Sequence, residues 1–326
     1  MNLLKQTKEL CKIYEIHPAR SKGQNFLIKE DIYQQIIESA DLQKNDTVLE
    51  VGPGLGFLTT KLTEKVKQVV AVELDDKLAE ILRVKLEKKG VENVEVINED
   101  ILKIANNIIL SVIASETKPT GEVKRGNPVK NALSDGIATS SSFASLRQTP
   151  RNDIKYKVVA NLPYNITSIF LRKFISEIEH KPKIMVLLLQ KEVVERIMAK
   201  PGQMSLLTVS AQFYAKVAKI ADVPASAFWP QPKVDSAIIA LKIGRDVTLP
   251  RLDEKKFFRL VKIGFSSKRK QLQKNLSAGL HIEQNKIKEI LKKNNLNEKV
   301  RAQELSLDDW HGLYVDFFGK IRQDKI

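Results

Sequence analysis

A run of four residues, Asn161-Leu162-Pro163-Tyr164, follows a short apolar stretch and combines side chains that could act on a nucleobase amine. Such an amine is a poor nucleophile because its lone pair is delocalised into the ring. The Asn161 side-chain carbonyl and the Leu162 backbone carbonyl can accept its two N–H groups and favour a pyramidal, more nucleophilic nitrogen. Pro163 fixes the turn, and Tyr164 offers a face on which an extruded base can stack. Taken alone, the same run also fits a strand-ending turn with a buried tyrosine.

A glycine-rich turn, Glu-Val-Gly-Pro-Gly-Leu-Gly at 50–56, stands between a predicted strand and a predicted helix. Its glycines allow a ligand to approach the backbone at a helix N-terminus, which any nucleotide would explain. Two carboxylates narrow the choice of ligand. Glu73 ends the next predicted strand, where it can accept both ribose hydroxyls, and Asp100 follows the third strand, where it can accept from an adenine amine.

Phosphate contacts have little support in this sequence. Pro53 removes one backbone N–H from the glycine-rich turn, and no Gly-Lys-Ser/Thr motif is present. Ribose and adenine contacts without phosphate contacts suit S-adenosylmethionine as the cofactor. The four histidines are scattered, so we expect no metal site.

Short β-branched runs alternate with helical patterns over most of the chain. This alternation predicts an α/β fold with a mostly parallel, Rossmann-like sheet covered on both faces. Strands are expected at 47–51, 69–73, 94–97, 157–160 and 184–189, and helices at 58–65, 77–88, 168–178 and 192–200. The last two strands, at 215–223 and 234–242, have no long helix between them, which predicts an antiparallel final strand.

Two regions depart from this pattern. Residues 111–152 are rich in Ser, Thr, Gly and Pro and lack periodicity, so we expect a flexible, low-complexity insertion there. The strand pattern stops after Pro250, and helices are expected at 257–265, 268–276, 284–293 and 307–317. The chain is therefore predicted to hold one domain at 1–248 and a small all-α domain at 249–326.

The chain carries a net charge of +15, which favours a polyanionic partner over general solubility as its explanation. Residues 249–326 contain 18 Lys and Arg against 10 Asp and Glu. A positive field without a membrane-type amphipathic cluster predicts nucleic acid as the partner and no membrane. The single cysteine, Cys11, and an N-terminus without a signal-type apolar run predict a reducing, cytoplasmic location.

Taken together, the motifs resemble the KsgA-type ribosomal RNA adenine N6-dimethyltransferases nearly end to end, apart from the insertion at 111–152. The residues that carry the resemblance are 23–27, 50–56, Glu73, Asp100, 161–164, 223–228, 232–236 and 265–272.

The resemblance implies a class I S-adenosylmethionine methyltransferase fold with a C-terminal RNA-binding helical domain, acting as a monomer. It implies cofactor contacts from six residues: Asn25, Leu27, Gly52, Glu73, Asp100 and Asn161. It also implies that Leu162, Tyr164 and Phe228 join Asn161 in a catalytic pocket for a flipped adenine.

The implied reaction is N6,N6-dimethylation of two adjacent adenosines near the 3′ end of small-subunit (16S) rRNA in a pre-30S particle, during ribosome biogenesis. One alternative is a large-subunit rRNA adenine methyltransferase of the macrolide-resistance type, which shares the N-terminal motifs. Residues 262–276 and 301–307 favour the first because they are similar to its C-terminal domain. A second alternative is a non-catalytic nucleic-acid-binding assembly factor that kept the fold. A DNA adenine methyltransferase is disfavoured, because those enzymes usually carry Pro at the position of Leu162.

Overall fold

The structure is a computed structural model that describes residues 2–18, 24–104, 156–244 and 252–319. The insertion expected at 111–152, Gly23 of the N-terminal motif and the predicted domain boundary at 248 lie outside the described residues. The same holds for the basic stretch Arg20-Ser21-Lys22, which is expected to contribute to RNA binding.

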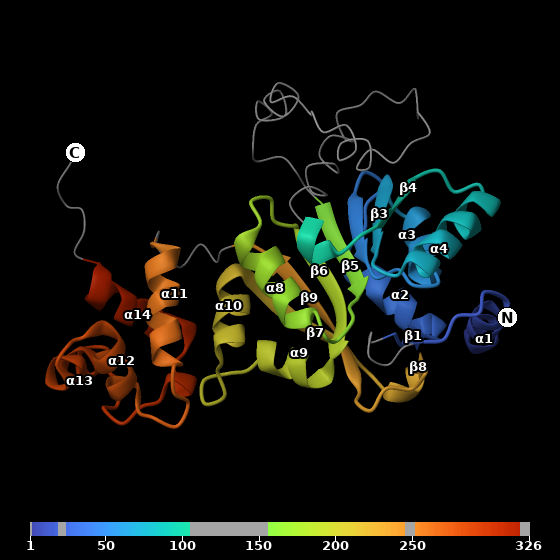
Figure 1. Ribbon diagram of the computed structural model, residues 1–326. Coiled ribbons are helices and arrows are strands. Elements are labelled where there is room, and N and C mark those ends of the chain that lie inside the picture. Colours follow the sequence, from blue (N-terminus) through green and yellow to red (C-terminus); the bar gives the residue numbers. More distant parts are fainter. Residues whose placement is uncertain (1, 19–23, 105–155, 245–251, 320–326) are drawn as a thin grey trace, which may run out of the picture.

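One seven-stranded sheet forms the centre of the molecule, and its strand order is β4-β3-β2-β5-β6-β9-β7 (Figure 1). The first five strands in this order pair in parallel, and β9 runs antiparallel to both of its neighbours. The strands are β2 (Thr47–Val51), β3 (Gln68–Glu73), β4 (Val94–Asn98), β5 (Tyr156–Asn161), β6 (Ile184–Gln190), β7 (Ala215–Val223) and β9 (Ser236–Ile243). The predicted fold class is confirmed, including its antiparallel final strand.

Successive strand residues point to opposite faces of the sheet, and helices bury both faces. Val48 belongs to a core covered by α2 (Glu30–Ser39), α3 (Phe57–Thr63) and α4 (Asp76–Lys88). Its neighbour Leu49 belongs to a second core covered by α8 (Thr167–Arg172), α9 (Lys191–Ile197) and α10 (Leu206–Tyr214). A π-helical turn, Lys173–Glu177, continues α8.

Four helices, α11 (Glu254–Gly264), α12 (Leu272–Leu280), α13 (Gln284–Lys293) and α14 (Leu307–Phe318), gather beyond α10 at the end of the molecule opposite α1 (Leu3–Ile13) (Figure 1). They share the second core with the sheet, because Phe213 of α10 stacks on Phe257 of α11 with ring centroids 4.9 Å apart. The fully buried Trp310 packs against Gly264, where an added Cβ would lie 2.3 Å from the indole ring. The division of the chain into two domains stays a prediction.

The helix expected at 268–276 begins only at Leu272, so that part of the prediction was wrong. Asn275 explains the late start, because its side-chain amide donates to the backbone carbonyls of Gly264 and Ser267, at 2.7 and 3.0 Å. These bonds hold the connection between α11 and α12 in a non-helical path. Residues 268–270 consequently lie in an exposed turn before the helix.

Three helices, α1, α2 and α10, and two short strands were not predicted. The two strands, β1 (Phe26–Leu27) and β8 (Phe228–Trp229), pair with each other as a separate antiparallel sheet. A two-residue strand is too short to show a periodicity of two, so its pairing cannot be seen in the sequence.

Candidate functional site

A cavity of about 380 Å³ opens at the carboxyl ends of β2, β3 and β5, where the strand order reverses direction. Ligands of open α/β sheets bind at this topological switch point, and the volume falls within the roughly 300–1,000 Å³ of small-molecule sites. All nine predicted site residues line this one cavity: Asn25, Leu27, Gly52, Glu73, Asp100, Asn161, Leu162, Tyr164 and Phe228. Their individual roles stay predictions.

The glycine-rich turn forms the floor of the cavity between β2 and α3. Gly56, the N-cap of α3, has a φ of 72°, and an added Cβ would lie 2.3 Å from Cδ1 of Leu82. A larger residue at this position would therefore have to displace the Leu82 side chain and adopt a strained left-handed backbone. Gly54 has a φ of 56°, and its backbone N–H points to the carboxylate of Glu73, which accepts it at 3.0 Å.

Glu73 is held in place by two backbone N–H groups, one on each carboxylate oxygen. Oε2 accepts from Gly54, and Oε1 accepts from Asp75 at 3.0 Å. A carboxylate oxygen can accept more than one hydrogen bond, so both oxygens can still take a ligand hydroxyl. Burial raises the pKa of Glu73, and the two backbone N–H groups act in the opposite direction. The turn and the carboxylate thus orient each other.

Two further residues beside Glu73, Leu74 and Asp75, line the cavity and were not singled out from the sequence. Leu74 lines the cavity and keeps 68% of its surface exposed, so its side chain is accessible to a ligand. Asp75 caps α4 by accepting from Leu78 N–H at 3.3 Å and also accepts from the Gln24 side chain at 3.3 Å. The run Glu73-Leu74-Asp75 is itself the signal, because an apolar residue between two carboxylates at a strand end offers a flat group both packing and hydrogen bonds.

Asp100 follows β4 and begins a short helical turn over residues 101–104. Its Oδ1 accepts from Leu102 N–H at 2.9 Å, which fixes the side chain at the N-terminus of that turn. Ile101 is buried next to it and also lines the cavity. The end of β4 therefore contributes a polar and an apolar residue to the cavity wall, as Glu73 and Leu74 do at the end of β3.

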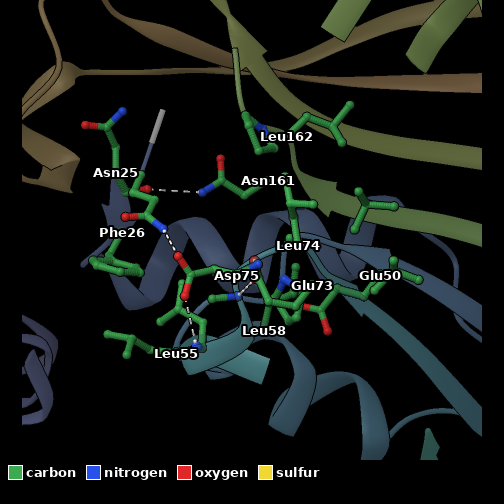
Figure 2. A pocket seen from close by; sticks show the side chains of 18 of the residues that line it. Asn25, Phe26, Glu50, Leu55, Leu58, Glu73, Leu74, Asp75, Asn161 and Leu162 are labelled. Carbon is green, nitrogen blue, oxygen red and sulfur yellow. Dashed lines mark hydrogen bonds between the residues drawn. The ribbon is translucent and has the colours of Figure 1, made fainter. Parts of the chain in front are cut away.

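Asn161 ends β5 across the cavity from Glu73 and Asp75, and Figure 2 shows its side chain directed toward Asn25. Its Nδ2 donates to the Asn25 backbone carbonyl at 3.5 Å, a long hydrogen bond. This contact assigns the amide so that its carbonyl oxygen is left as an acceptor. Leu162 follows with its side chain buried and its N–H donating to Leu188 of β6 at 3.3 Å, so the motif is anchored on the sheet.

Tyr164 and Phe228 bring two aromatic rings to the same cavity from distant parts of the chain. The Tyr164 hydroxyl lies 2.8 Å from Oγ of Ser236. Phe228 is buried, and its backbone pairs with Leu27 in the small β1–β8 sheet. A predicted cofactor residue and a predicted base-pocket residue are thus direct neighbours.

The cavity is acidic. Five carboxyl groups lie among the described residues that line it, namely Glu50, Glu73, Asp75, Glu99 and Asp100, and none of the residues in that lining is Lys, Arg or His. Such a site disfavours phosphate and suits a ligand that carries positive charge and hydrogen-bond donors. A ribose, an amino-purine and a sulfonium or ammonium group meet this description.

Glu50 lies beneath the glycine-rich turn with only 1% of its surface exposed. Burial raises the pKa of its carboxyl to about 8, and nearby Glu73 adds to the rise, while the neighbouring Thr59 hydroxyl and Lys85 oppose it. Glu50 therefore holds its proton at neutral pH. Lys85 donates to the Leu55 carbonyl of the turn at 2.7 Å, and burial lowers its pKa to about 8.

Comparison with known proteins gives one family and one fold. The family model described as "Ribosomal RNA adenine dimethylase" matches residues 17–315. The chain is 37% identical to "Ribosomal RNA small subunit methyltransferase A" of Dehalococcoides mccartyi (strain CBDB1), over 98% of this chain and 94% of that protein. It is 35% identical to the protein of the same name in Nostoc sp. (strain PCC 7120 / SAG 25.82 / UTEX 2576), over 90% of this chain and 96% of the other.

Two solved structures share the fold. A dimethyladenosine transferase from Plasmodium falciparum aligns with a TM-score of 0.63 at 24% identity, over 90% of this chain and 97% of the other. The 23S rRNA methyltransferase ErmE aligns with a TM-score of 0.62 at 23% identity, over 89% of this chain and 98% of the other. Among the helices that the structure describes, none has the length and apolar character needed to cross a membrane.

Replacing Glu50 with Gln tests whether the buried Glu50 carboxyl group is protonated in the folded protein. The unfolded chain loses this proton near the ordinary glutamate pKa, whereas the folded protein keeps it up to about pH 8. The stability that Glu50 contributes therefore falls as pH rises between these values, by at most about 1.4 kcal/mol per pH unit. Urea unfolding at pH 5, 6, 7 and 8 should show Glu50→Gln gaining stability over wild type with rising pH.

The control is Glu87→Gln, at an exposed position near the end of α4. It should track wild type at every pH. Lys85 remains protonated in both states over most of this range, so it does not obscure the difference. Parallel curves for Glu50→Gln and wild type would show that Glu50 is ionised in the folded protein.

Proposed function

Because the chain belongs to the ribosomal RNA adenine dimethylase family, we propose that it is a methyltransferase that uses S-adenosylmethionine to convert two adjacent adenosines near the 3′ end of small-subunit (16S) rRNA to N6,N6-dimethyladenosine. The observation that carries the proposal is the single cavity, which joins the Asn161–Tyr164 motif to the glycine-rich turn and Glu73. The small-subunit name of the relatives supports the choice of substrate.

The cavity residues fit S-adenosylmethionine. Glu73 supplies acceptors for the ribose hydroxyls, and Asp100 supplies one for the adenine amine. Leu74 and Ile101 provide apolar surface for the purine. When bound, the cofactor supplies a methyl group made electrophilic by its sulfonium. The carboxylates around the cavity are the electrostatic environment that a sulfonium favours.

The residues of the chain have to position the adenine amine and exclude water. Asn161 Oδ1 and the Leu162 carbonyl would accept the two N–H groups of the amine, so that its lone pair is directed at the methyl group. Tyr164 and Phe228 would hold the ring of the flipped base. The amine can lose its proton after methyl transfer, so no buried general base is required. The second transfer needs the same pocket to admit a base that already carries one methyl.

The two alternatives are less well supported. The likeness to ErmE, a 23S rRNA methyltransferase, shows the fold alone, whereas the relatives named for the small subunit match over nearly the whole chain. A non-catalytic assembly factor would not need Asn161 and the two aromatic residues brought together at one cavity.

The proposed partner is an immature small ribosomal subunit, which places the enzyme in the cytoplasm during ribosome biogenesis. The helical region after residue 249 would supply most of the RNA contacts, since it carries much of the positive charge. Action as a monomer and without a metal stay predictions.

The direct test is methyl transfer to purified immature small subunits. We expect wild-type protein with S-adenosylmethionine to yield N6,N6-dimethyladenosine, measured by mass spectrometry of digested rRNA. Asn161→Ala should lower the transfer rate by about 10²–10³-fold, because the amide acts on the amine in the transition state. Gln34→Ala, which removes an exposed amide on α2, should leave the rate unchanged. Near-normal turnover in Asn161→Ala would reject the positioning role.

Glu73→Gln tests the cofactor assignment. Glutamine keeps one carbonyl oxygen for the backbone N–H groups but removes the charge, and a charge-assisted hydrogen bond contributes about 1.5–3 kcal/mol. We expect S-adenosylmethionine affinity to fall at least about tenfold by calorimetry. Glu80→Gln, an exposed carboxylate on α4, should bind like wild type. Equal affinity in both variants would place the ribose elsewhere.

The exposed turn Lys268-Arg269-Lys270 between α11 and α12 is proposed as part of the RNA footprint. Replacing all three residues with Gln should weaken binding to immature small subunits and reduce the dependence of that binding on salt. S-adenosylmethionine affinity should not change. The control replaces three exposed lysines of α1, Lys5, Lys8 and Lys12, at the opposite end of the molecule. Equal weakening in both triple variants would indicate a net-charge effect without a local footprint.

A further inference from the structure

We infer that Ser236 is a positioning residue, whose hydroxyl fixes the ring of Tyr164 in the plane on which the target base stacks. The inference rests on the proposed function, and it gives a task to a segment, residues 232–236, that the site has so far left unexplained. Ser236 is not part of the cavity lining described above. It would act on the base through Tyr164 alone.

The hydrogen bond between the two hydroxyls is short, and only one of the two residues is fully buried. Oγ of Ser236 lies 2.8 Å from the Tyr164 hydroxyl, and either oxygen can donate. Ser236 is fully buried, whereas Tyr164 is half-buried and lines the cavity. A buried hydroxyl of serine is expected to keep a partner, because leaving it unpaired costs free energy. Each hydroxyl therefore holds the other.

The backbone at Ser236 is held between two neighbouring strands. Ser236 is the first residue of β9, and it pairs with Gln190 of β6 on one side and with Val223 of β7 on the other. Tyr164, in contrast, lies in the turn between β5 and α8, outside any strand or helix. The hydroxyl pair thus connects a ring on a turn to a strand in the interior of the sheet.

The residue before Ser236 extends the same support to the second aromatic ring. The backbone carbonyl of Asp235 accepts from Lys191 N–H at 3.0 Å, and its Oδ1 accepts from Ala225 N–H at 2.9 Å. Ala225 begins the short 3₁₀ turn that leads directly into Phe228. Two consecutive residues, Asp235 and Ser236, therefore hold the segments that present Phe228 and Tyr164.

Ring orientation has a direct effect on rate. A stacked base takes its plane from the ring beneath it, and its N6 amine lies at the far edge of the purine. A small rotation of the ring is therefore magnified at the amine, and a displacement of 1 Å can lower a rate by about 10²-fold. Loss of a single neutral hydrogen bond should produce a smaller change, because Tyr164 retains its packing.

The test is a double-mutant cycle with Ser236→Ala and Tyr164→Phe, each of which removes one hydroxyl. Either variant should lower kcat for methyl transfer to immature small subunits by about 3- to 10-fold, with KM for the subunit and S-adenosylmethionine affinity unchanged. The double variant should lose no more than either single variant, because both remove the same hydrogen bond. Losses that multiply in the double variant, or an unchanged kcat in Ser236→Ala, would overturn the inference.

Ser39→Ala is the matched control, since it removes a serine hydroxyl that donates to a backbone carbonyl in α2, outside the cavity. It should leave kcat unchanged. A second readout does not depend on activity. In protein labelled with ¹³C at the tyrosine Cζ, the resonance missing from Tyr164→Phe identifies Tyr164, and Ser236→Ala should shift it. If this resonance does not move, the inference is overturned, whether or not the wild-type protein transfers a methyl group. A wild-type protein that transfers no methyl group would by itself reject only the proposed function.

Discussion

The parallel pairing of β2 with β5 is the constraint on which the rest of the site depends. Glu50 stands opposite Val159 in this register, so the two strands end at the same edge and deliver the glycine-rich turn beside Asn161. Gly52 and Asn161 are far apart in the sequence, yet a Cβ placed on Gly52 would lie 3.8 Å from the Asn161 carbonyl. Because both strands are buried on both faces, a slip of one residue would exchange the two cores and is strongly disfavoured. The position of the Asn161–Tyr164 motif is therefore set by core packing.

Hydrogen bonds from backbone N–H groups explain how several carboxyl groups can lie around one cavity despite the cost of desolvating them. Glu73 is compensated by backbone N–H groups of the turn and of the segment before α4. Asp75 and Asp100 each accept from a helix N-terminus, where the backbone carries partial positive charge. Glu50, which has only weak compensation, keeps its proton. The cavity thus presents negative charge to a ligand without cationic side chains of its own among the described residues that line it.

The sequence was a good guide wherever a run of residues carried its own pattern. The β2 strand was predicted to the residue because Thr47–Val51 is a short run rich in β-branched residues between Asp46 and Gly52, and all nine predicted site residues line one cavity. What could not be predicted depends on contacts between distant segments. Asn275 delays α12 through bonds to Gly264 and Ser267, and the partnership of Ser236 with Tyr164 spans more than seventy positions. Neither contact leaves a local periodicity.

The small β1–β8 sheet links two walls of the cavity. Leu27 and Phe228 are paired residues of this sheet, and the hydrogen bond from Ile28 N–H to the Ala227 carbonyl, at 2.8 Å, continues it. The cavity wall with the predicted cofactor residue Leu27 and the wall with the predicted base-pocket residue Phe228 are thus joined through backbone hydrogen bonds. A ligand that displaces one wall would therefore act on the other through these backbone hydrogen bonds. Such a coupling is reciprocal, so each ligand would change the binding of the other by the same factor, whichever arrives first.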